Sequence, residues 1–401
     1  MITKIELFKT MPSTQKILWT LCIISLLFST VTLILIYNPQ TLNALIPKES
    51  TTEQTDTTHL SYPLKSLKDR NPLTPIIENN TKHFYLEASP IHWEYKQNQY
   101  LVAWAYNNQI PGPQIRVTEG DHVKITLKNN LFVPTSLHWH GLEIPYTQDG
   151  LPGITQQAIQ PNTSYTYEFI AKPQGTRFYH THGSTHGDEA QQLDMGLSGA
   201  FIIEPKQPTT QQNKNTIQNN NNDNNKNKFY DKEYTLILDE WEILPDGQNA
   251  ANPALQQNNK NKESTPTHSM NYNLYTINGR AFPDTEPIVV KENDKILLRL
   301  INAGTSATHP IHIHGHSFKI IATDGNPVPL NAIITKDTIN IAPGERYDLE
   351  LIANNPGIWI THCHELHHAD AGMVIPLIYE GYSLNLSQMK NTNTISHTTH
   401  Q

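Results

Sequence analysis

The sequence predicts an all-β protein of two β-sandwich domains, preceded by one apolar helix at the N-terminus. Short runs of alternating apolar and polar residues, broken by Gly, Pro and Asn, recur at the spacing of sandwich strands. Residues 108–131 and 278–303 share one plan, in which a turn with Pro, a strand and an acidic turn precede a strand that ends in Asn. A long uncharged stretch, residues 17–37, lies near the N-terminus.

The N-terminal segment has the composition of a membrane anchor. Lys4, Lys9 and Lys16 precede the uncharged stretch, and basic residues on this side favour a cytoplasmic N-terminus with an exported remainder. We therefore expect residues 1–40 to be a membrane anchor or signal segment. The rest of the chain is then extracytoplasmic, in the periplasm or at the cell surface. A cleaved signal peptide is the alternative, although the stretch is long for one and no clear A-x-A site follows it.

The composition of the remaining chain indicates a tether, two domains, a linker between them and a tail. Residues 41–75 are rich in Thr, Ser and Pro and are predicted to form a flexible tether. Strand patterns occupy residues 76–205 and residues 231–382, which we interpret as domain 1 and domain 2. Between them, residues 206–230 are Asn-rich and cannot build a core, so they are expected to form a linker or insertion. Residues 383–401 are expected to be a disordered tail.

Charge and composition exclude some partners and point to histidine. The net charge of −8 argues against nucleic acid, whose phosphates require a basic face. The chain has twenty histidines but only two cysteines, Cys22 in the apolar segment and Cys363. Cysteines so placed cannot pair, and a lone thiol among histidines is typical of a metal ligand or nucleophile. Thirteen histidines fall in four clusters, at 138/140, 180/182/186, 309/312/314/316 and 362/364/367/368.

Strand alternation divides the cluster in THCHELHHADAGM (361–373) between two faces. Residues i and i+2 of a strand share a face, and residue i+1 points to the other. His362 and His364 therefore face one way and Cys363 faces the other. One strand then serves two sites, one with a thiolate and one with two imidazoles.

The segment THPIHIHGHSF (308–318) repeats this arrangement. His312 and His314 share a face, whereas His309 has the opposite parity. His309 is thus a natural partner for Cys363, and the other two histidines partner the imidazole pair of the first segment. Pro310, next to His309, is a residue that can bend a strand.

The turn after Cys363 offers further ligands for the thiol site. His368 and Met373 follow at +5 and +10, beside Gly372. Two imidazoles, a thiolate and a distant thioether form the trigonal blue-copper set, which suits one-electron transfer. Core packing is the alternative for Met373 alone.

The first domain supplies imidazoles without a thiol. Two His-x-His pairs, in HWHG and HTHG, join the two pairs of domain 2 to make eight imidazoles: His138, His140, His180, His182, His312, His314, His362 and His364. Eight are too many for one metal. Three coppers bound by two, three and three histidines would use all of them, and neutral imidazole suits copper.

These segments resemble the four copper signatures of the multicopper oxidases, the laccase-like family. The signatures are HWHG, HTHG, HPIHIHGHSF and HCHELHHADAGM, and the flanks YNNQIPGPQIRVTEGD, PYTQDGLPGITQ and APGERYDL also match. The resemblance covers roughly residues 85–382. It implies two cupredoxin-like Greek-key β-sandwich domains and four coppers per chain, of which one is type 1, one is type 2 and two are type 3.

Position by position, the resemblance implies a ligand set for each copper. Type 1 copper would have His309, Cys363, His368 and Met373. Type 2 copper would have His138 and His312. One type 3 copper would have His140, His180 and His364, and the other would have His182, His314 and His362.

The resemblance also implies acids near the cluster. Asp149, nine residues after His140, matches the family's acidic residue and is expected to relay protons to oxygen. A plain turn aspartate in Q-D-G is the alternative. Ala369 stands where relatives often carry a second acid, which puts that second relay in doubt.

The spacing of the signatures resembles the two-domain subclass with type 1 copper in the second domain. Only 126 residues separate His182 from His309, which leaves no room for a whole middle domain. In that subclass three chains form a ring, and each three-copper cluster lies between domain 1 of one subunit and domain 2 of the next. A homotrimer is therefore implied, while a cluster within one chain stays open.

The implied activity is a copper-dependent oxidase. A phenolic or similar small reductant would give single electrons to type 1 copper, and Cys363, His362 and His364 would carry them to the cluster, where O2 becomes water.

A Mn(II), Fe(II) or Cu(I) oxidase is the alternative, although the six methionines do not cluster near the copper loops. Copper nitrite reductases of two domains carry type 1 copper in domain 1, which here has no Cys. A simple copper carrier would not need eight imidazoles.

Overall fold

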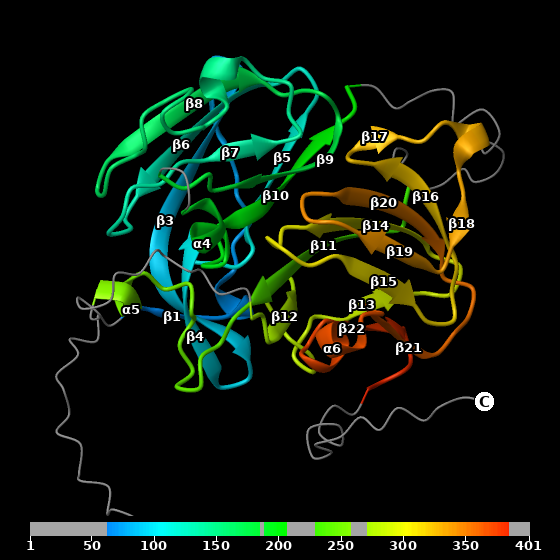
Figure 1. The fold of residues 1–401 in the computed structure, drawn as a ribbon. Helices are drawn as coiled ribbons and strands as arrows, with labels where there is room; N and C mark the ends of the chain where they lie inside the picture. Colours follow the sequence, from blue (N-terminus) through cyan, green and yellow to red (C-terminus); the bar gives the residue numbers. More distant parts are fainter. Residues whose placement is uncertain (1–61, 185–187, 207–228, 258–270, 385–401) are drawn as a thin grey trace, which may run out of the picture. The chain divides into compact units, whose positions relative to one another are not determined.

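The computed structural model describes residues 62–184, 188–206, 229–257 and 271–384. Regular structure in these ranges is mostly β-strand, which confirms the predicted class (Figure 1). The α-helices among them are short: α4 (Glu189–Leu193), α5 (Ala254–Gln257) and α6 (Leu366–Asp370). Across the described ranges no helix is long and apolar enough to span a bilayer. The predicted N-terminal helix lies outside them, as do most of the Asn-rich stretch and of the C-terminal tail.

The end of the predicted tether proves to be folded. β1 (Leu64–Lys65) pairs in parallel with β3 (Thr81–Lys96), and a 3-10 turn, η1 (Leu67–Asp69), follows it. The Arg70 guanidinium donates hydrogen bonds to the backbone oxygens of Ile110 and Asn278. The tether prediction for residues 41–75 is therefore wrong over residues 64–70. This segment is held through its backbone, the Arg70 cation and one apolar contact of Leu67, so it shows no apolar periodicity.

The first sandwich consists of two sheets, drawn from blue to green in Figure 1. One sheet has the order β1-β3-β6-β8, and β2 and β4 also pair with β3; its further strands are β2 (Ile76–Glu78), β4 (Gln99–Tyr106), β6 (His122–Asn129) and β8 (Ser164–Ile170). The other has the order β5-β10-β9-β7, formed by β5 (Gly112–Thr118), β7 (His138–His140), β9 (Gly175–His180) and β10 (Ser198–Glu204).

The second sandwich has the same two-sheet plan. One sheet has the order β12-β11-β14-β20-β16-β17, with β18 also on β16; its strands are β11 (Lys232–Trp241), β12 (Leu274–Ile277), β14 (Lys295–Asn302), β16 (Phe318–Thr323), β17 (Asn326–Pro327), β18 (Thr335–Lys336) and β20 (Arg346–Ile352). The other has the order β13-β22-β21-β15-β19, formed by β13 (Ile288–Val290), β15 (His309–Ile313), β19 (Thr338–Ile341), β21 (Ile358–Cys363) and β22 (Val374–Tyr379).

Strand pairing supports the duplication that the sequence plan predicts. β5 pairs in parallel with β10, and β13 pairs in parallel with β22. The strand that follows each of them, β6 or β14, has one parallel and one antiparallel neighbour. The two similar sequence segments therefore occupy equivalent places in the two sandwiches.

Each sandwich has its own apolar core, and two smaller clusters contain residues of both sandwiches; the larger of these is the joining cluster. Cys363 and Met373 belong to the second core and are fully buried. The joining cluster includes Trp93 from domain 1 and Trp241 from domain 2. Trp93 Nε1 also donates a hydrogen bond to Gly279 O at 2.6 Å, which fixes the two sandwiches to each other. The turns that follow β15 and β21 therefore project from a rigid scaffold.

Candidate metal centre

Antiparallel pairing of β15 with β21 sets the geometry of the site. The register places His312 opposite His362 and Ile311 opposite Cys363. Side chains that are opposite each other point to the same face, and the next pair points to the other. Cys363 therefore points into the apolar core, and the two paired histidines point to the other face, as alternation predicts.

Three donor atoms converge on the core face. Cys363 Sγ lies 3.8 Å from His309 Nδ1 and 3.6 Å from His368 Nδ1, and the two nitrogens are 3.2 Å apart. Bonds of about 2.0 Å to nitrogen and about 2.3 Å to sulfur, arranged trigonally, would put the nitrogens about 3.5 Å apart and each about 3.7 Å from sulfur. The three side chains are therefore spaced so that one metal ion could lie between them.

Burial keeps the imidazole and the thiol of this site uncharged before a metal binds. Burial, with a smaller effect of His368, lowers the pKa of His309 to about 3, so its imidazole is neutral at physiological pH. Burial raises the pKa of the Cys363 thiol to about 12. The thiol therefore keeps its proton until a cation at the site replaces it.

Backbone contacts hold the turn that carries His368 and Met373. Cys363 N donates to Met373 O at 3.1 Å, and Met373 N donates to His368 O at 2.9 Å. Gly372 between them has φ +125°, and a Cβ there would press against Ala281 and the backbone of Tyr275. The glycine therefore lets this turn pack closely, with the Met373 side chain buried in the core.

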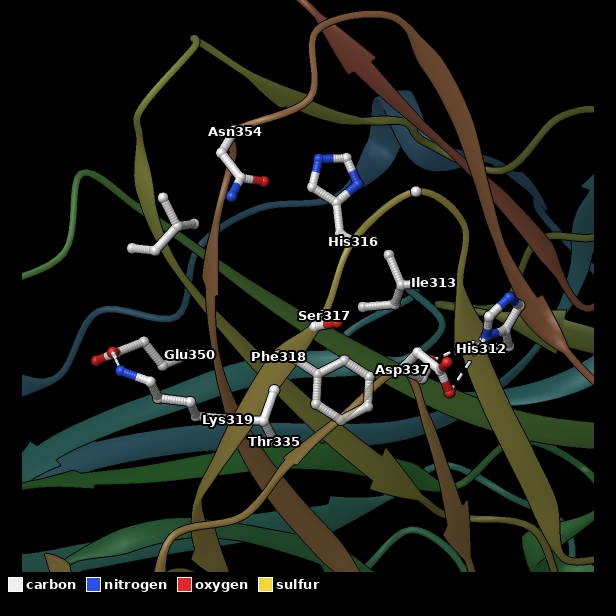
Figure 2. Close-up of a pocket in the computed structure, with 12 residues that line it drawn as sticks. His312, Ile313, His316, Ser317, Phe318, Lys319, Thr335, Asp337, Glu350 and Asn354 are labelled. Atoms are coloured by element: carbon white, nitrogen blue, oxygen red, sulfur yellow. Dashed lines mark hydrogen bonds and ion pairs between the residues drawn. The ribbon is translucent and has the colours of Figure 1, made fainter.

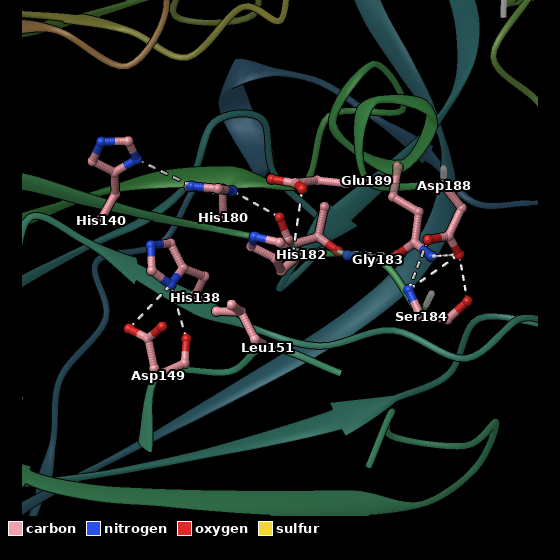
Figure 3. Close-up of polar contacts among 12 residues, drawn as sticks. His138, His140, Asp149, Leu151, His180, His182, Gly183, Ser184, Asp188 and Glu189 are labelled. Atoms are coloured by element: carbon pink, nitrogen blue, oxygen red, sulfur yellow. Dashed lines mark hydrogen bonds and ion pairs between the residues drawn. The ribbon is translucent and has the colours of Figure 1, made fainter. Parts of the chain in front are cut away.

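The four histidines of domain 1 form a second group, which we name the domain 1 quartet: His138, His140, His180 and His182. Figure 3 shows these rings together. His140 Nδ1 and His180 Nε2 approach to 3.3 Å. Burial is the main cause that lowers the pKa of His140 to about 3, with Arg346 next, and burial also places the pKa of His180 well below its usual value. Two neutral nitrogens at this separation are suited to share a cation.

Two acidic residues contact the outer nitrogens of this quartet (Figure 3). His138 Nδ1 donates to the backbone oxygen of Asp149 at 2.8 Å, and the Asp149 carboxylate lies 3.5 Å from the same nitrogen. The Glu189 carboxylate, at the start of α4, lies 3.3 Å from His182 Nδ1. These contacts fix the two rings and leave Nε2 of each free to bind a metal.

The histidines of domain 2 form the equivalent domain 2 quartet: His312, His314, His362 and His364. His314 Nε2 and His362 Nε2 are 3.0 Å apart. Burial lowers the pKa of His362 to about 4 and also lowers that of His314. His364 is exposed to solvent in the single chain.

An aspartate also orients the first histidine of the domain 2 quartet. His312 Nδ1 donates to the backbone oxygen of Asp337 at 2.9 Å, and the Asp337 carboxylate is 4.0 Å away. Both residues line a pocket of 480 Å³ that also contains Lys319 and Glu350 (Figure 2). His312 and His138 thus have matching surroundings in the two domains.

The two quartets stay apart within one chain. Among the described residues, no hydrogen bond or ring contact joins a histidine of one quartet to a histidine of the other. His138 and His140 line a 360 Å³ pocket whose domain 2 wall is Asp324, Asn326 and Arg346, without a domain 2 histidine. Each quartet is therefore half of the predicted set of eight.

Sequence reasoning missed several neighbours of these histidines. Asp337 comes close only through strand pairing, and Glu189 is brought to His182 by the turn into α4; no motif marks either of them. Glu365, by contrast, lies inside the HCHELHH stretch, where its Oε2 is 3.2 Å from His368 Nε2. The Tyr275 ring stacks on the His368 ring with centroids 3.9 Å apart. These four residues orient or cover imidazoles rather than add ligands.

The remaining histidines of the clusters have other places. His316 is buried and bonds to His314 O at 3.0 Å and to the Tyr379 hydroxyl at 2.6 Å, so its role is structural. His367 is exposed on α6. His186 lies outside the described residues.

A glycine substitution tests whether the Asp149 loop positions His138. Gly150 has φ +84°, and a Cβ there would overlap the carbonyl oxygen of Leu137, next to His138. Gly150→Ala should displace the loop and lower copper affinity about 10- to 100-fold, measured by chelator competition. Gly153→Ala is the matched control, since Gly153 has φ +78° and open space around its Cβ position. Equal copper affinity in the two variants would contradict the positioning role.

Comparison with known proteins agrees with this geometry. Two family models, each described as multicopper oxidase, match residues 87–208 and 249–381. The multicopper oxidase mco of Staphylococcus haemolyticus is 27% identical over 399 residues, which cover 74% of this chain and 88% of that protein. Copper resistance protein A of Escherichia coli is 28% identical over 280 residues, covering 61% of this chain and 42% of that protein.

Among solved structures, copper enzymes also share the fold of this chain. The blue copper oxidase from Nitrosomonas europaea is 33% identical with a TM-score of 0.60, over 75% of this chain and 86% of that one. A copper nitrite reductase from the same organism is 23% identical with a TM-score of 0.57, over 75% of this chain and 94% of that one, and shares the fold. Because the Nitrosomonas europaea oxidase is 33% identical and matched over 86% of its length, and both family models are multicopper oxidase models, the chain belongs to the multicopper oxidase family, the copper oxidoreductases that use O2.

Proposed function

We propose that this protein couples one-electron oxidation of a phenolic or similar small reductant to four-electron reduction of O2 to water. The observation that carries the proposal is the position of Cys363 between two sites, with the thiol on the core face and His362 on the other face. A protein that only stored copper would not need a thiol site joined by one peptide unit to a cluster of imidazoles.

The type 1 centre is assigned to His309, Cys363, His368 and Met373. When bound there, copper supplies a fast one-electron couple. The protein contributes a rigid set of donors: two of the side chains, Cys363 and Met373, are core residues, and the core excludes water from the sulfur. Donors held by core packing resist rearrangement when the metal's charge changes.

The three remaining coppers are assigned to the two quartets, and the shortest contacts match this division. His138 and His312, proposed for type 2 copper, are the two rings whose Nδ1 atoms donate to an aspartate backbone oxygen. The close pair His140 and His180 is proposed for one type 3 copper, with His364. The close pair His314 and His362 is proposed for the other, with His182.

A short route joins the two centres. Cys363 is bonded through the backbone to His362 and His364, and His362 Nδ1 also donates a hydrogen bond to Cys363 O at 2.9 Å. An electron that reaches the thiolate therefore has both a covalent and a hydrogen-bonded route to the cluster imidazoles. We assign Cys363, His362 and His364 to this transfer.

The first test is purification with copper. We expect four coppers per chain, an intense blue thiolate-to-copper absorption band, and O2 uptake with a phenol. Cys363→Ser should remove the blue band and lower turnover by at least about 1000-fold, while the cluster histidines keep their metal. O2 uptake only with Mn(II), Fe(II) or Cu(I) would favour a metal-ion oxidase. No O2 uptake with any reductant would exclude both functions.

The proposal assigns proton delivery to Asp149, whose carboxylate lies 3.5 Å from His138 Nδ1 and is partly exposed. Reduction of O2 to water consumes four protons, which a group between solvent and cluster can pass on. Asp149→Asn keeps the backbone oxygen that binds His138 but removes the proton carrier, so turnover should fall about 100-fold or more with copper content unchanged. Full turnover of a variant with four coppers would refute the relay.

Copper nitrite reduction is a weaker candidate. Two-domain trimers of that class are expected to carry the type 1 thiolate in the first domain. Cys363 lies in the second sandwich, and the described part of the first sandwich contains no Cys. We therefore favour O2 as the acceptor.

The separation of the quartets supports a homotrimer with type 1 copper in domain 2. Each quartet would meet the complementary quartet of a neighbouring chain. We further propose that the folded part is extracytoplasmic and held at the membrane by residues 1–40, on the basis of the uncharged stretch after Lys16.

Complementation distinguishes a shared cluster from one within a chain. One variant carries His138→Ala and His140→Ala, and the other carries His312→Ala and His314→Ala. Each alone should be inactive. Co-expressed in one assembly, they should regain part of the O2 uptake, because intact halves from different chains can meet. A trimer mass with no regained activity would place the cluster within one chain.

A further inference from the structure

Of the four proposed type 1 ligands, His368 is the one that approaches solvent. His309, Cys363 and Met373 are each 0% exposed, and no described group bonds to His309 Nε2. The His368 side chain retains 12% exposure. Because electron transfer requires close approach, a reductant in solution must meet the centre at the His368 ring.

Neighbours cover one edge and one face of this ring. His368 Nδ1 faces the thiol, so Nε2 is on the opposite side. The Tyr275 ring covers a face of the imidazole, with the two planes inclined by 21°. The edge that carries Nε2 lies opposite the thiol and offers an approach for a donor.

A carboxylate lies at that edge. Glu365 Oε2 is 3.2 Å from His368 Nε2 and 3.1 Å from the backbone nitrogen of His368, which donates to it as the N-cap contact of α6. The Glu365 side chain is 39% exposed, and no described residue bonds to its Oε1. An approaching molecule thus meets Oε1 in solvent while Oε2 is tied to the imidazole.

The surrounding sequence supplies no lysine or arginine that would offset this negative charge. Residues 347–389 contain no lysine or arginine, and Asp370 ends the same helix. Leu366, 41% exposed, is the apolar neighbour of the carboxylate. The chain has a net charge of −8, so the local sign agrees with the sign of the whole.

We propose that Glu365 is the specificity-determining residue of the reductant site, and that among small reductants it favours those with a positive charge, whether organic cations or metal aquo ions. This inference rests on the proposed type 1 centre. The carboxylate attracts the cation to within transfer distance of His368 and repels anions. Each reductant loses one electron to the centre with no bond broken, and four such electrons with four protons convert O2 to two waters.

The test compares two donors with the same redox core and opposite charge. These are (ferrocenylmethyl)trimethylammonium and ferrocenecarboxylate, with Fe(II) and Mn(II) as the metal-ion arm. Glu365→Gln keeps an oxygen that can cap α6 but removes the charge. We expect kcat/KM for the ferrocenyl cation to fall about three- to tenfold, mainly through KM, and that for the anion to rise by a similar factor. Glu365→Asp should restore part of the preference.

A second readout does not depend on turnover. Loss of the carboxylate at Nε2 makes the imidazole a weaker donor, so the midpoint potential of the blue chromophore should rise in Glu365→Gln, with its absorption band kept. Glu292→Gln is the control for net charge. Glu292 is exposed and lies just beyond Val290, which pairs with Tyr379 at the far end of β22 from the metal site. Glu292→Gln should alter neither the midpoint potential of the blue chromophore nor the ratio of kcat/KM for the two ferrocenyl donors.

The outcomes separate this inference from the proposed function. Suppose that the wild-type protein is blue and active, and that the ratio of kcat/KM for the cation to kcat/KM for the anion is the same in Glu365→Gln as in the wild type. This result would overturn the inference but not the proposed function. A change of equal factor for both donors would also overturn it, because that is a structural effect. Protein that takes up no O2 with any donor would refute the proposed function and the inference with it. If Fe(II) and Mn(II) respond but the ferrocenyl cation does not, selection by charge is refuted.

Discussion

The alternation of side chains along one strand is the constraint on which this molecule depends. At the end of β21, successive residues must point to opposite faces, so one peptide unit separates a thiol in the apolar core from an imidazole on the other face. The partner strand β15 repeats the alternation in register. Two chemically different sites can therefore be adjacent without sharing a ligand.

Burial determines the chemistry on both faces in the same way. It lowers the pKa of His309, His140 and His362 to between about 3 and about 4. It raises the pKa of Cys363 to about 12, so the free thiol is kept protonated. The apolar environment thus favours uncharged donors throughout, and a metal cation is what makes a thiolate stable there.

The sequence was most informative where function depends on local geometry. His-x-His and His-Cys-His spacing predicts which side chains share a face, and the core contacts of Cys363 agree with it. Tertiary relations were less accessible: Asp337 reaches His312 only because β19 pairs with β15, 25 residues further along the chain. Glu189 reaches His182 from a five-residue helix with no motif. β1 was missed because a two-residue strand held by its backbone leaves no apolar pattern.

The register between β15 and β21 limits which insertions and deletions the protein can accept. Substitutions on β21 alter one side chain at a time, whereas an inserted or deleted residue in the ladder would turn every following side chain to the opposite face. A single codon gained there would move the sulfur out of the core and bring an imidazole into it. We therefore expect length variation among relatives to accumulate in connecting loops, and this strand to tolerate point changes outside its two ligand positions but not changes of length.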